Sequence, residues 1–128
     1  MDKNKYYKWL FLTGAVWNIA VGLLCIIVTI FLLDFAVPIF GMDIPPSLIW
    51  LHFYFGFVAI FGIGYYLVYR DINKNHGIVI LGIMEKFLVF IIAIIYFILG
   101  DINLISLLLV SIDLLYGGLF LEFLLHFK

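Results

Sequence analysis

Long apolar runs alternate with short polar stretches along this chain, and the runs have the length of membrane-spanning helices. About 20 apolar residues in a helix cover the roughly 30 Å hydrocarbon core of a bilayer. Four runs meet this length, at residues 9–33, 47–69, 78–99 and 103–127. The stretches between them, residues 34–46, 70–77 and 100–102, contain turn and helix-breaking residues. We therefore expect an all-α integral membrane protein in which residues 1–128 form a single domain of four transmembrane helices.

The connection between the last two runs has room only for a turn. Gly100, Asp101 and Ile102 separate them, so the third and fourth helices should be antiparallel neighbours. Asp101 or Asn103 is expected to cap the start of the fourth helix. The pattern as a whole predicts an up-down-up-down four-helix bundle.

Composition agrees with a membrane location and excludes several classes of protein. Hydrophobic residues make up 67% of the 128 residues and the mean hydropathy is +1.27, which a water-soluble core of this size cannot accommodate. The lipid bilayer is thus the first expected partner. The formal net charge of -1 gives no indication of nucleic-acid binding. Cys25 is the only cysteine, which excludes an internal disulfide, a CxxC pair and a thiolate metal cluster.

Lysine and arginine residues predict the orientation of the chain, because they remain on the cytoplasmic side when they lie in short loops. They precede the first helix, lie between the second and third, and end the chain: Lys3, Lys5, Lys8, Arg70, Lys74 and Lys128. The other two connections contain only acidic residues as charged groups. We therefore expect both termini in the cytoplasm.

Three polar residues within the apolar runs are predicted to lie in one layer of the bilayer. Counted along the helices, Lys86 is roughly 12 Å deep, Asn18 about 13 Å deep and Asp113 near the membrane centre. Small residues flank them at helical spacing and form stripes where helices approach closely: Gly14, Gly22, Gly82, Gly117 and, on the second helix, Gly56, Ala59 and Gly62. A contact between Lys86 and Asp113, completed by Asn18, is the least costly way to retain these groups.

The sequence leaves the role of this layer open. An isolated charge at a helix centre costs about 2.5 to 3.5 kcal/mol, so Lys86 and Asp113 form either a structural ion pair or a ligand or proton site. Asn18 alone is typical of an interhelical hydrogen bond. Glu85, turned about 100° from Lys86, has three interpretations. It pairs with a second subunit, is protonated, or reaches towards Tyr65 or Tyr66.

Other polar and aromatic residues are expected near the membrane surfaces. The aromatic belt is predicted to include Tyr6, Tyr7, Trp9 and Trp50. Glu122 and His126, four residues apart, are interpreted as a pair that extends to the solvated surface.

The sequence contains no recognisable catalytic set. The three histidines, His52, His76 and His126, lie at different levels, so we expect no haem, no metal site and no other cofactor. Nucleophile-elbow, phosphate-loop and zinc-protease motifs do not occur. No residue is therefore assigned as catalytic, and an enzyme is the less favoured interpretation.

Four short motifs resemble a group of small bacterial four-helix membrane proteins that are broadly DoxX-like. They are GAVWN at 14–18, GIGYY at 62–66, GIMEK at 82–86 and IDLLYGG at 112–118. The resemblance implies the four-helix architecture and a bacterial or archaeal cytoplasmic membrane, and it implies no established activity. Some members carry peroxide-reductase labels, but this chain lacks the paired cysteines that such chemistry needs.

Two functions fit these observations. The first is a transporter- or channel-like protein, assembled as a homo-oligomer, whose layer of Lys86, Asp113, Asn18 and Glu85 binds a small solute or relays protons. The alternative is a structural or accessory subunit that has no substrate and uses its small-residue stripes to bind another membrane protein.

Overall fold

The computed structural model describes residues 2–127, and this part of the chain contains helices and no strand. Four helices are long: α1 (Lys3–Phe31), α3 (Ile49–Arg70), α4 (His76–Leu99) and α5 (Leu104–His126). All four are long and apolar enough to cross a membrane. The predicted all-α class and the four predicted helices are thus confirmed, although α1 begins at Lys3 rather than at residue 9.

The connection between α1 and α3 holds a short helix that the sequence analysis did not predict. This helix, α2 (Leu33–Ile39), follows a break at Leu32, whose N–H still donates to the Val28 carbonyl of α1. Asp34 lies in its first turn, where a carboxylate is favoured by the positive helix N-terminus. Residues 34–46, which we expected to connect two helices through turn and helix-breaking residues, thus begin with a short helix.

The end of α2 is attached to the start of α5. The Asn103 amide Nδ2 donates to the Ile39 carbonyl at 2.6 Å, and its backbone N–H donates to the Phe40 carbonyl at 3.1 Å. The Asn103 side chain also accepts from the Ser106 N–H, so the predicted cap of this helix is confirmed. Gly41 lies against Asn103 with a positive φ of 76°, a conformation that L side chains rarely adopt.

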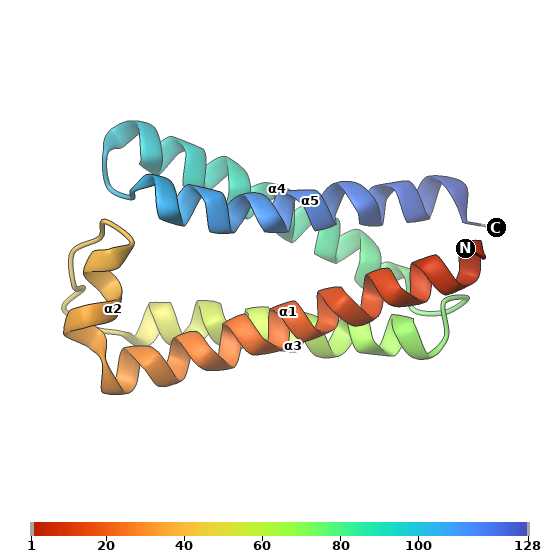
Figure 1. Ribbon diagram of the computed structural model, residues 1–128, viewed down its shortest axis with the longest axis horizontal. Coiled ribbons are helices and arrows are strands. Elements are labelled where there is room, and N and C mark those ends of the chain that lie inside the picture. The colour runs from red at the N-terminus through yellow and green to blue at the C-terminus, as the bar shows by residue number, and fades with distance from the viewer. Residues whose placement is uncertain (1, 128) are drawn as a thin grey trace.

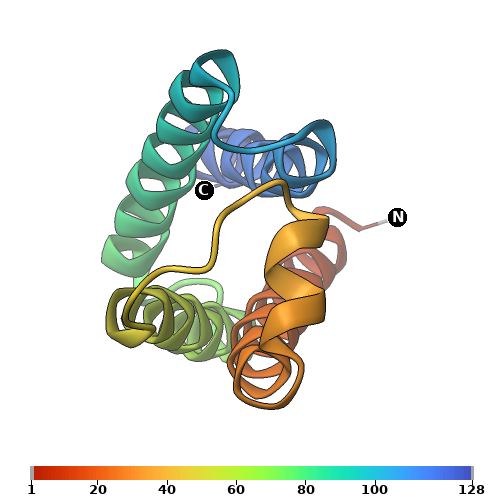
Figure 2. The ribbon, with the colours of Figure 1, turned by 90° about the vertical axis from the view of Figure 1, so that its left-hand side faces the viewer.

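The long helices form two pairs. Helix α1 packs mainly against α3, and α4 packs mainly against α5, as expected for helices joined by the short Gly100 turn. Both described ends of the chain lie at one end of the molecule, which we call the terminal end, with α2 at the other (Figure 1). Seen from the α2 end, the pairs lie on opposite sides of the molecule, and α4 runs obliquely from α5 towards α3 (Figure 2).

Close packing within the α1–α3 pair depends on two glycines. A Cβ atom on Gly22 would lie 2.6 Å from the Phe55 carbonyl oxygen, and one on Gly62 would lie 2.9 Å from the Ile19 nitrogen. No such contact exists at Gly56, where a Cβ atom would meet nothing within 4 Å. The small-residue stripe predicted on α3 is therefore wrong at Gly56, which does not face α1.

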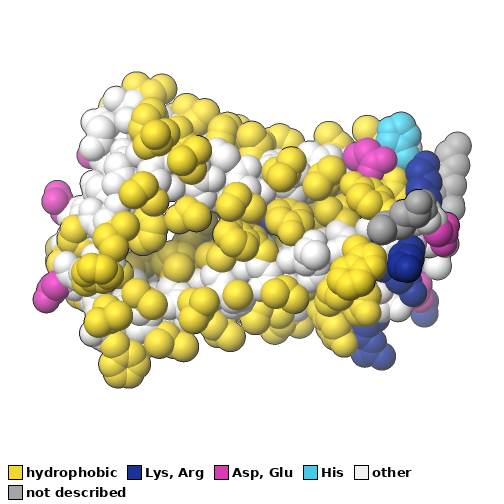
Figure 3. All heavy atoms as spheres, in the orientation of Figure 1, with side chains coloured by type: hydrophobic (Ala, Val, Ile, Leu, Met, Phe, Trp, Pro, Cys, Tyr) yellow, Lys and Arg dark blue, Asp and Glu magenta, His cyan; other side chains and the backbone are white. Residues whose placement is uncertain are grey.

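Aromatic rings fill the core at the terminal end. Tyr7, Phe11, Tyr65, Phe120 and Phe123 are all fully buried there. Tyr7 stacks edge-on against Phe123, with ring centroids 4.9 Å apart, so its assignment to an interfacial belt was wrong. Elsewhere hydrophobic side chains cover the surface, while Lys and Arg gather at the terminal end (Figure 3).

Candidate functional site

The polar centre of the bundle is the side chain of Lys86 on α4. Its ammonium group is fully enclosed, and it donates to Asp113 Oδ1 on α5 at 2.9 Å and to Asn18 Oδ1 on α1 at 3.2 Å. The predicted contact of Lys86 with Asp113 and Asn18 is thus present. Residues that are far apart in the sequence meet because each lies on the inward face of its helix.

Asn18 connects this ion pair to the remaining long helix. Its Nδ2 donates to the backbone carbonyl of Val58 on α3 at 3.1 Å, while its Oδ1 accepts from Lys86. Both ends of the amide are therefore used, and Asn18 is only 1% exposed. The Lys86 cluster, defined as Lys86, Asp113 and Asn18, joins all four long helices at one level.

Two tyrosine rings complete the surroundings of the Lys86 ammonium group. Its nitrogen lies 5.4 Å from the ring centroid of Tyr65 and 5.8 Å from that of Tyr116, within the range of cation–π attraction. Gly82 makes room for this arrangement, since a Cβ atom there would lie 2.6 Å from the Tyr65 hydroxyl oxygen. These contacts of Tyr65 and Tyr116 with the lysine were not predicted, although small residues mark both positions: Tyr65 follows Gly62 and Gly64, and Tyr116 precedes Gly117.

The two charges of the pair differ in their access to the surroundings. The Lys86 side chain is 1% exposed, whereas that of Asp113 is 20% exposed. Helices α1 and α5 touch where Gly14 meets Tyr116 and Phe120, and they separate towards α2. The surface is hollowed between them on that side of the molecule (Figure 3). Of the cluster's two charged groups, the carboxylate is thus the more exposed one.

Glu85 stands apart from the Lys86 cluster. Its Oε2 atom is buried and has no hydrogen-bond partner within the described part of the chain, and the same is true of the Tyr65 hydroxyl. The proposed contact between Glu85 and Tyr65 is thus not a hydrogen bond in this single chain. Partnership with a second subunit and protonation stay open as interpretations of Glu85.

Glu122 has a partner that the sequence did not suggest. The buried Tyr7 hydroxyl donates to Glu122 Oε1 at 2.9 Å, which links α1 to α5 at the terminal end. The interpretation of Glu122 and His126 as a solvated pair was therefore wrong for Glu122. Glu122 and His126 have the spacing of a helical pair, but Glu122 Oε1 accepts its hydrogen bond from a tyrosine of another helix.

The histidines do not converge on a common site. His52 Nε2 lies 3.0 Å from Thr29 Oγ1 between α3 and α1, while His76 Nε2 lies 2.7 Å from the Ile72 carbonyl oxygen. Over residues 2–127, no group of three or more His, Cys, Asp or Glu residues has the arrangement of a metal site.

Comparison of the chain with protein-family models, with curated proteins and with solved structures finds no match. The DoxX-like resemblance therefore stays a prediction from four short motifs.

Proposed function

We propose that this chain is a multi-pass protein of a bacterial or archaeal cytoplasmic membrane, inserted as an up-down-up-down bundle with both termini in the cytoplasm. Its four long apolar helices support insertion. The gathering of Lys and Arg at the terminal end supports the orientation.

The orientation can be tested without knowledge of the activity. A reporter fused after the last residue should give a cytoplasmic signal, and the same reporter inserted at Gly41 should give an external one. The opposite pattern would contradict the orientation and every depth assigned from it.

Within this membrane protein, we propose that the Lys86 cluster is the working site of a transporter- or channel-like activity that moves protons or a small solute. One observation carries the proposal: a fully enclosed cation is paired with a carboxylate that is 20% exposed. Ionisable groups inside membrane helices are costly and are typical of ion and proton pathways. Asp113 would receive the proton or solute, and Lys86 would be its counter-ion.

Assembly into a homo-oligomer is part of this proposal. A single copy leaves Glu85 Oε2 buried without a hydrogen-bond partner. Glu85 as a whole is only partly buried, so a second copy, or another membrane protein, would cover the rest of its side chain and enclose the hollowed face.

A structural or accessory role is the competing proposal, and a specific observation favours it. Lys86 receives two oxygen acceptors and two aromatic rings from the protein itself, so its charge is compensated without any ligand. In that case the cluster only fixes the positions of the four helices.

Flux measurements on purified protein in liposomes separate the two roles. We expect an imposed pH gradient to dissipate faster with the wild-type protein than in empty liposomes, and Lys86→Met to abolish the difference. Lys74→Met is the matched control, because Lys74 is an exposed lysine at the terminal end whose ion pair is with Asp71.

A small solute is the other possible cargo of the site, so the same liposomes are also tested by counterflow with pooled metabolites. Equal fluxes for wild type and Lys86→Met would exclude the lysine from transport, and a stoichiometric foreign partner on purification from native membranes would support the accessory role.

A further inference from the structure

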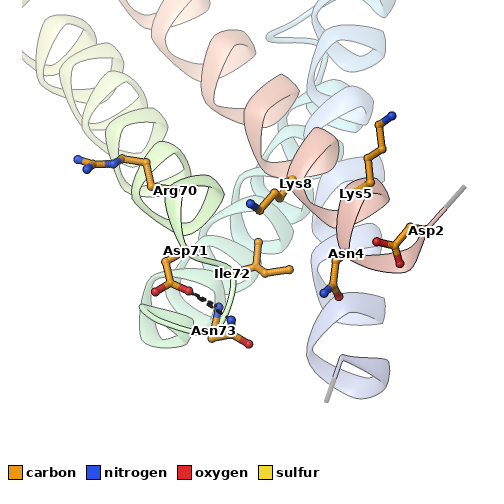
Figure 4. A pocket seen from close by; sticks show the side chains of 8 residues that line it. All are labelled: Asp2, Asn4, Lys5, Lys8, Arg70, Asp71, Ile72 and Asn73. Atoms are coloured by element: carbon orange, nitrogen blue, oxygen red, sulfur yellow. Dashed lines mark hydrogen bonds between the residues drawn. The ribbon is translucent and has the colours of Figure 1, made fainter.

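A polar pocket of about 340 Å³ lies at the terminal end, between the start of α1 and the turn that joins α3 to α4 (Figure 4). Both of these segments lie where the helices leave the apolar part of the molecule. The pocket is lined by Asp2, Asn4, Lys5, Lys8, Arg70, Asp71, Ile72 and Asn73. It is separate from the Lys86 cluster, which lies deeper in the bundle.

Among residues 2–127, the cations of this pocket have no carboxylate partner. Over residues 2–127 the ion pairs are Lys74 with Asp71 and Lys86 with Asp113, so Lys5, Lys8 and Arg70 take part in none. Asp71 is already occupied, because it accepts from the Asn73 backbone N–H at 3.1 Å and lies 3.5 Å from Lys74. The Asn73 N–H, with a further contribution from Lys74, holds the pKa of the Asp71 carboxyl below its ordinary value. The pocket therefore presents uncompensated positive charge.

A second, smaller pocket continues from the first along α1. It measures about 190 Å³ and is lined by Lys5, Lys8, Trp9, Leu12 and Tyr69. Lys5 and Lys8 line both pockets, and the other residues of the second are apolar or aromatic. Polar lining thus gives way to apolar lining as α1 and α3 run towards the middle of the bundle. This order matches a phospholipid, whose charged head group lies above its acyl chains.

We propose that these two pockets together bind an anionic phospholipid with a hydroxylated head group, of which phosphatidylglycerol is the simplest example. Lys5, Lys8 and Arg70 would bind the phosphate, as basic residues beside membrane helices do. The Asp2 carboxylate, which also lines the pocket, would accept hydrogen bonds from head-group hydroxyls. The apolar lining of the second pocket selects a lipid over a free phosphate ion.

Side-chain positions are compatible with this occupant. The Lys8 ammonium group lies among the other lining residues, whereas Lys5 and Arg70 extend to either side (Figure 4). Lys5, Lys8 and Arg70 are all exposed, and exposed side chains change rotamer within nanoseconds. Lys5 and Arg70 can therefore turn towards a phosphate without movement of the backbone.

Native mass spectrometry of the full chain, released from detergent micelles with added lipid, tests the proposal. We expect phosphatidylglycerol to be retained in preference to phosphatidylcholine of the same acyl chains. Each of Lys8→Gln and Arg70→Gln should weaken this retention about fivefold, the effect of one basic residue at an anionic lipid surface. Lys74→Gln is the matched control and should leave retention unchanged, because Lys74 does not line the pocket.

A further pair of measurements identifies the source of the phosphate. Trp9→Ala should weaken lipid retention, and an excess of inorganic phosphate should not displace the lipid. Displacement by inorganic phosphate, with no effect of Trp9→Ala, would show a soluble-anion site and overturn the assignment to a lipid. Equal retention of the two lipids, or an equal loss of lipid retention in Lys74→Gln and Lys8→Gln, would overturn the proposal that this pocket binds a lipid. Circular dichroism of each variant confirms that these exposed substitutions leave the helices intact.

Discussion

Removal of one partner from the Lys86 cluster should destabilise the bundle by an amount that depends on which charge is left behind. Asp113→Leu leaves an ammonium group that is 1% exposed, with Asn18 Oδ1 at 3.2 Å as its remaining oxygen acceptor. Breaking a buried ion pair in this way costs about 3 to 5 kcal/mol in soluble proteins. Lys86→Met leaves a carboxylate that is 20% exposed, so we expect a smaller loss, of about 1 to 3 kcal/mol.

The double variant isolates the contact itself. Without either charge the interior is neutral, so Lys86→Met with Asp113→Leu should be more stable than the sum of the single losses predicts. Interhelical polar contacts in membranes couple by about 0.6 kcal/mol on average and about 1.7 kcal/mol at most. We expect this charged, 2.9 Å contact to couple by at least about 1 kcal/mol.

Equilibrium unfolding in mixed micelles, driven by sodium dodecyl sulfate and followed by circular dichroism, measures all four free energies of unfolding. The cycle then consists of wild type, two single variants and the double variant. Additivity within about 0.5 kcal/mol would refute the reasoning, because independent sites behave in that way. A larger loss for Lys86→Met than for Asp113→Leu would refute the assignment of the more deeply buried charge.

Four further substitutions test other contacts of the bundle by the same unfolding assay. Gly22→Ala should cost about 1 to 3 kcal/mol because the new Cβ would lie 2.6 Å from a backbone oxygen of α3. Gly56→Ala is its control and should be neutral or slightly stabilising, because its Cβ would meet nothing within 4 Å. Similar losses for the two variants would mean that α1 and α3 are not in close contact. Tyr7→Phe should cost about 1 to 3 kcal/mol by removing the 2.9 Å donor to Glu122, and a silent substitution would show that the carboxyl finds another donor. Glu85→Gln should be silent if the carboxyl is protonated, and a clear loss of stability would assign it a charged partner.

The convergence of Lys86, Asp113 and Asn18 could be predicted from the sequence because it follows from helix geometry alone. A rise of about 1.5 Å per residue sets the depth of each side chain, and small neighbours at helical spacing mark the inward face. The sequence also offered Asn103, beside Asp101, as the cap of the last helix, because capping depends on residues that are adjacent in the chain. Properties of a single helix, or of its ends, can thus be predicted from the sequence alone.

Features that depend on how each helix is rotated about its axis relative to its neighbours could not be predicted from the sequence. Tyr7 and Trp9 have the same sequence signature of an interfacial aromatic, yet Tyr7 is fully buried and Trp9 is 52% exposed. Gly56 and Gly62 likewise have equivalent spacing, but only Gly62 lies against α1. The short helix α2 was missed because the hydrogen bonds that hold its end come from distant residues. Asn103 and Ser106 donate to the carbonyl groups of residues 39 and 40, more than sixty positions earlier in the chain.

Charge balance makes Glu85 the residue on which the oligomeric state depends. Lys86 and Asp113 neutralise each other, so an ionised Glu85 would be the one unmatched charge at this depth, at a cost of about 2.5 to 3.5 kcal/mol if isolated. Its Oε2 atom is buried without a partner, and the Tyr65 hydroxyl, which could have donated to it, is also unpartnered. A protonated carboxyl removes the charge within one chain, whereas an ionised one requires a donor from a second chain. Only the second case couples Glu85 to assembly, so a loss of oligomer in Glu85→Gln would place this residue at the subunit interface.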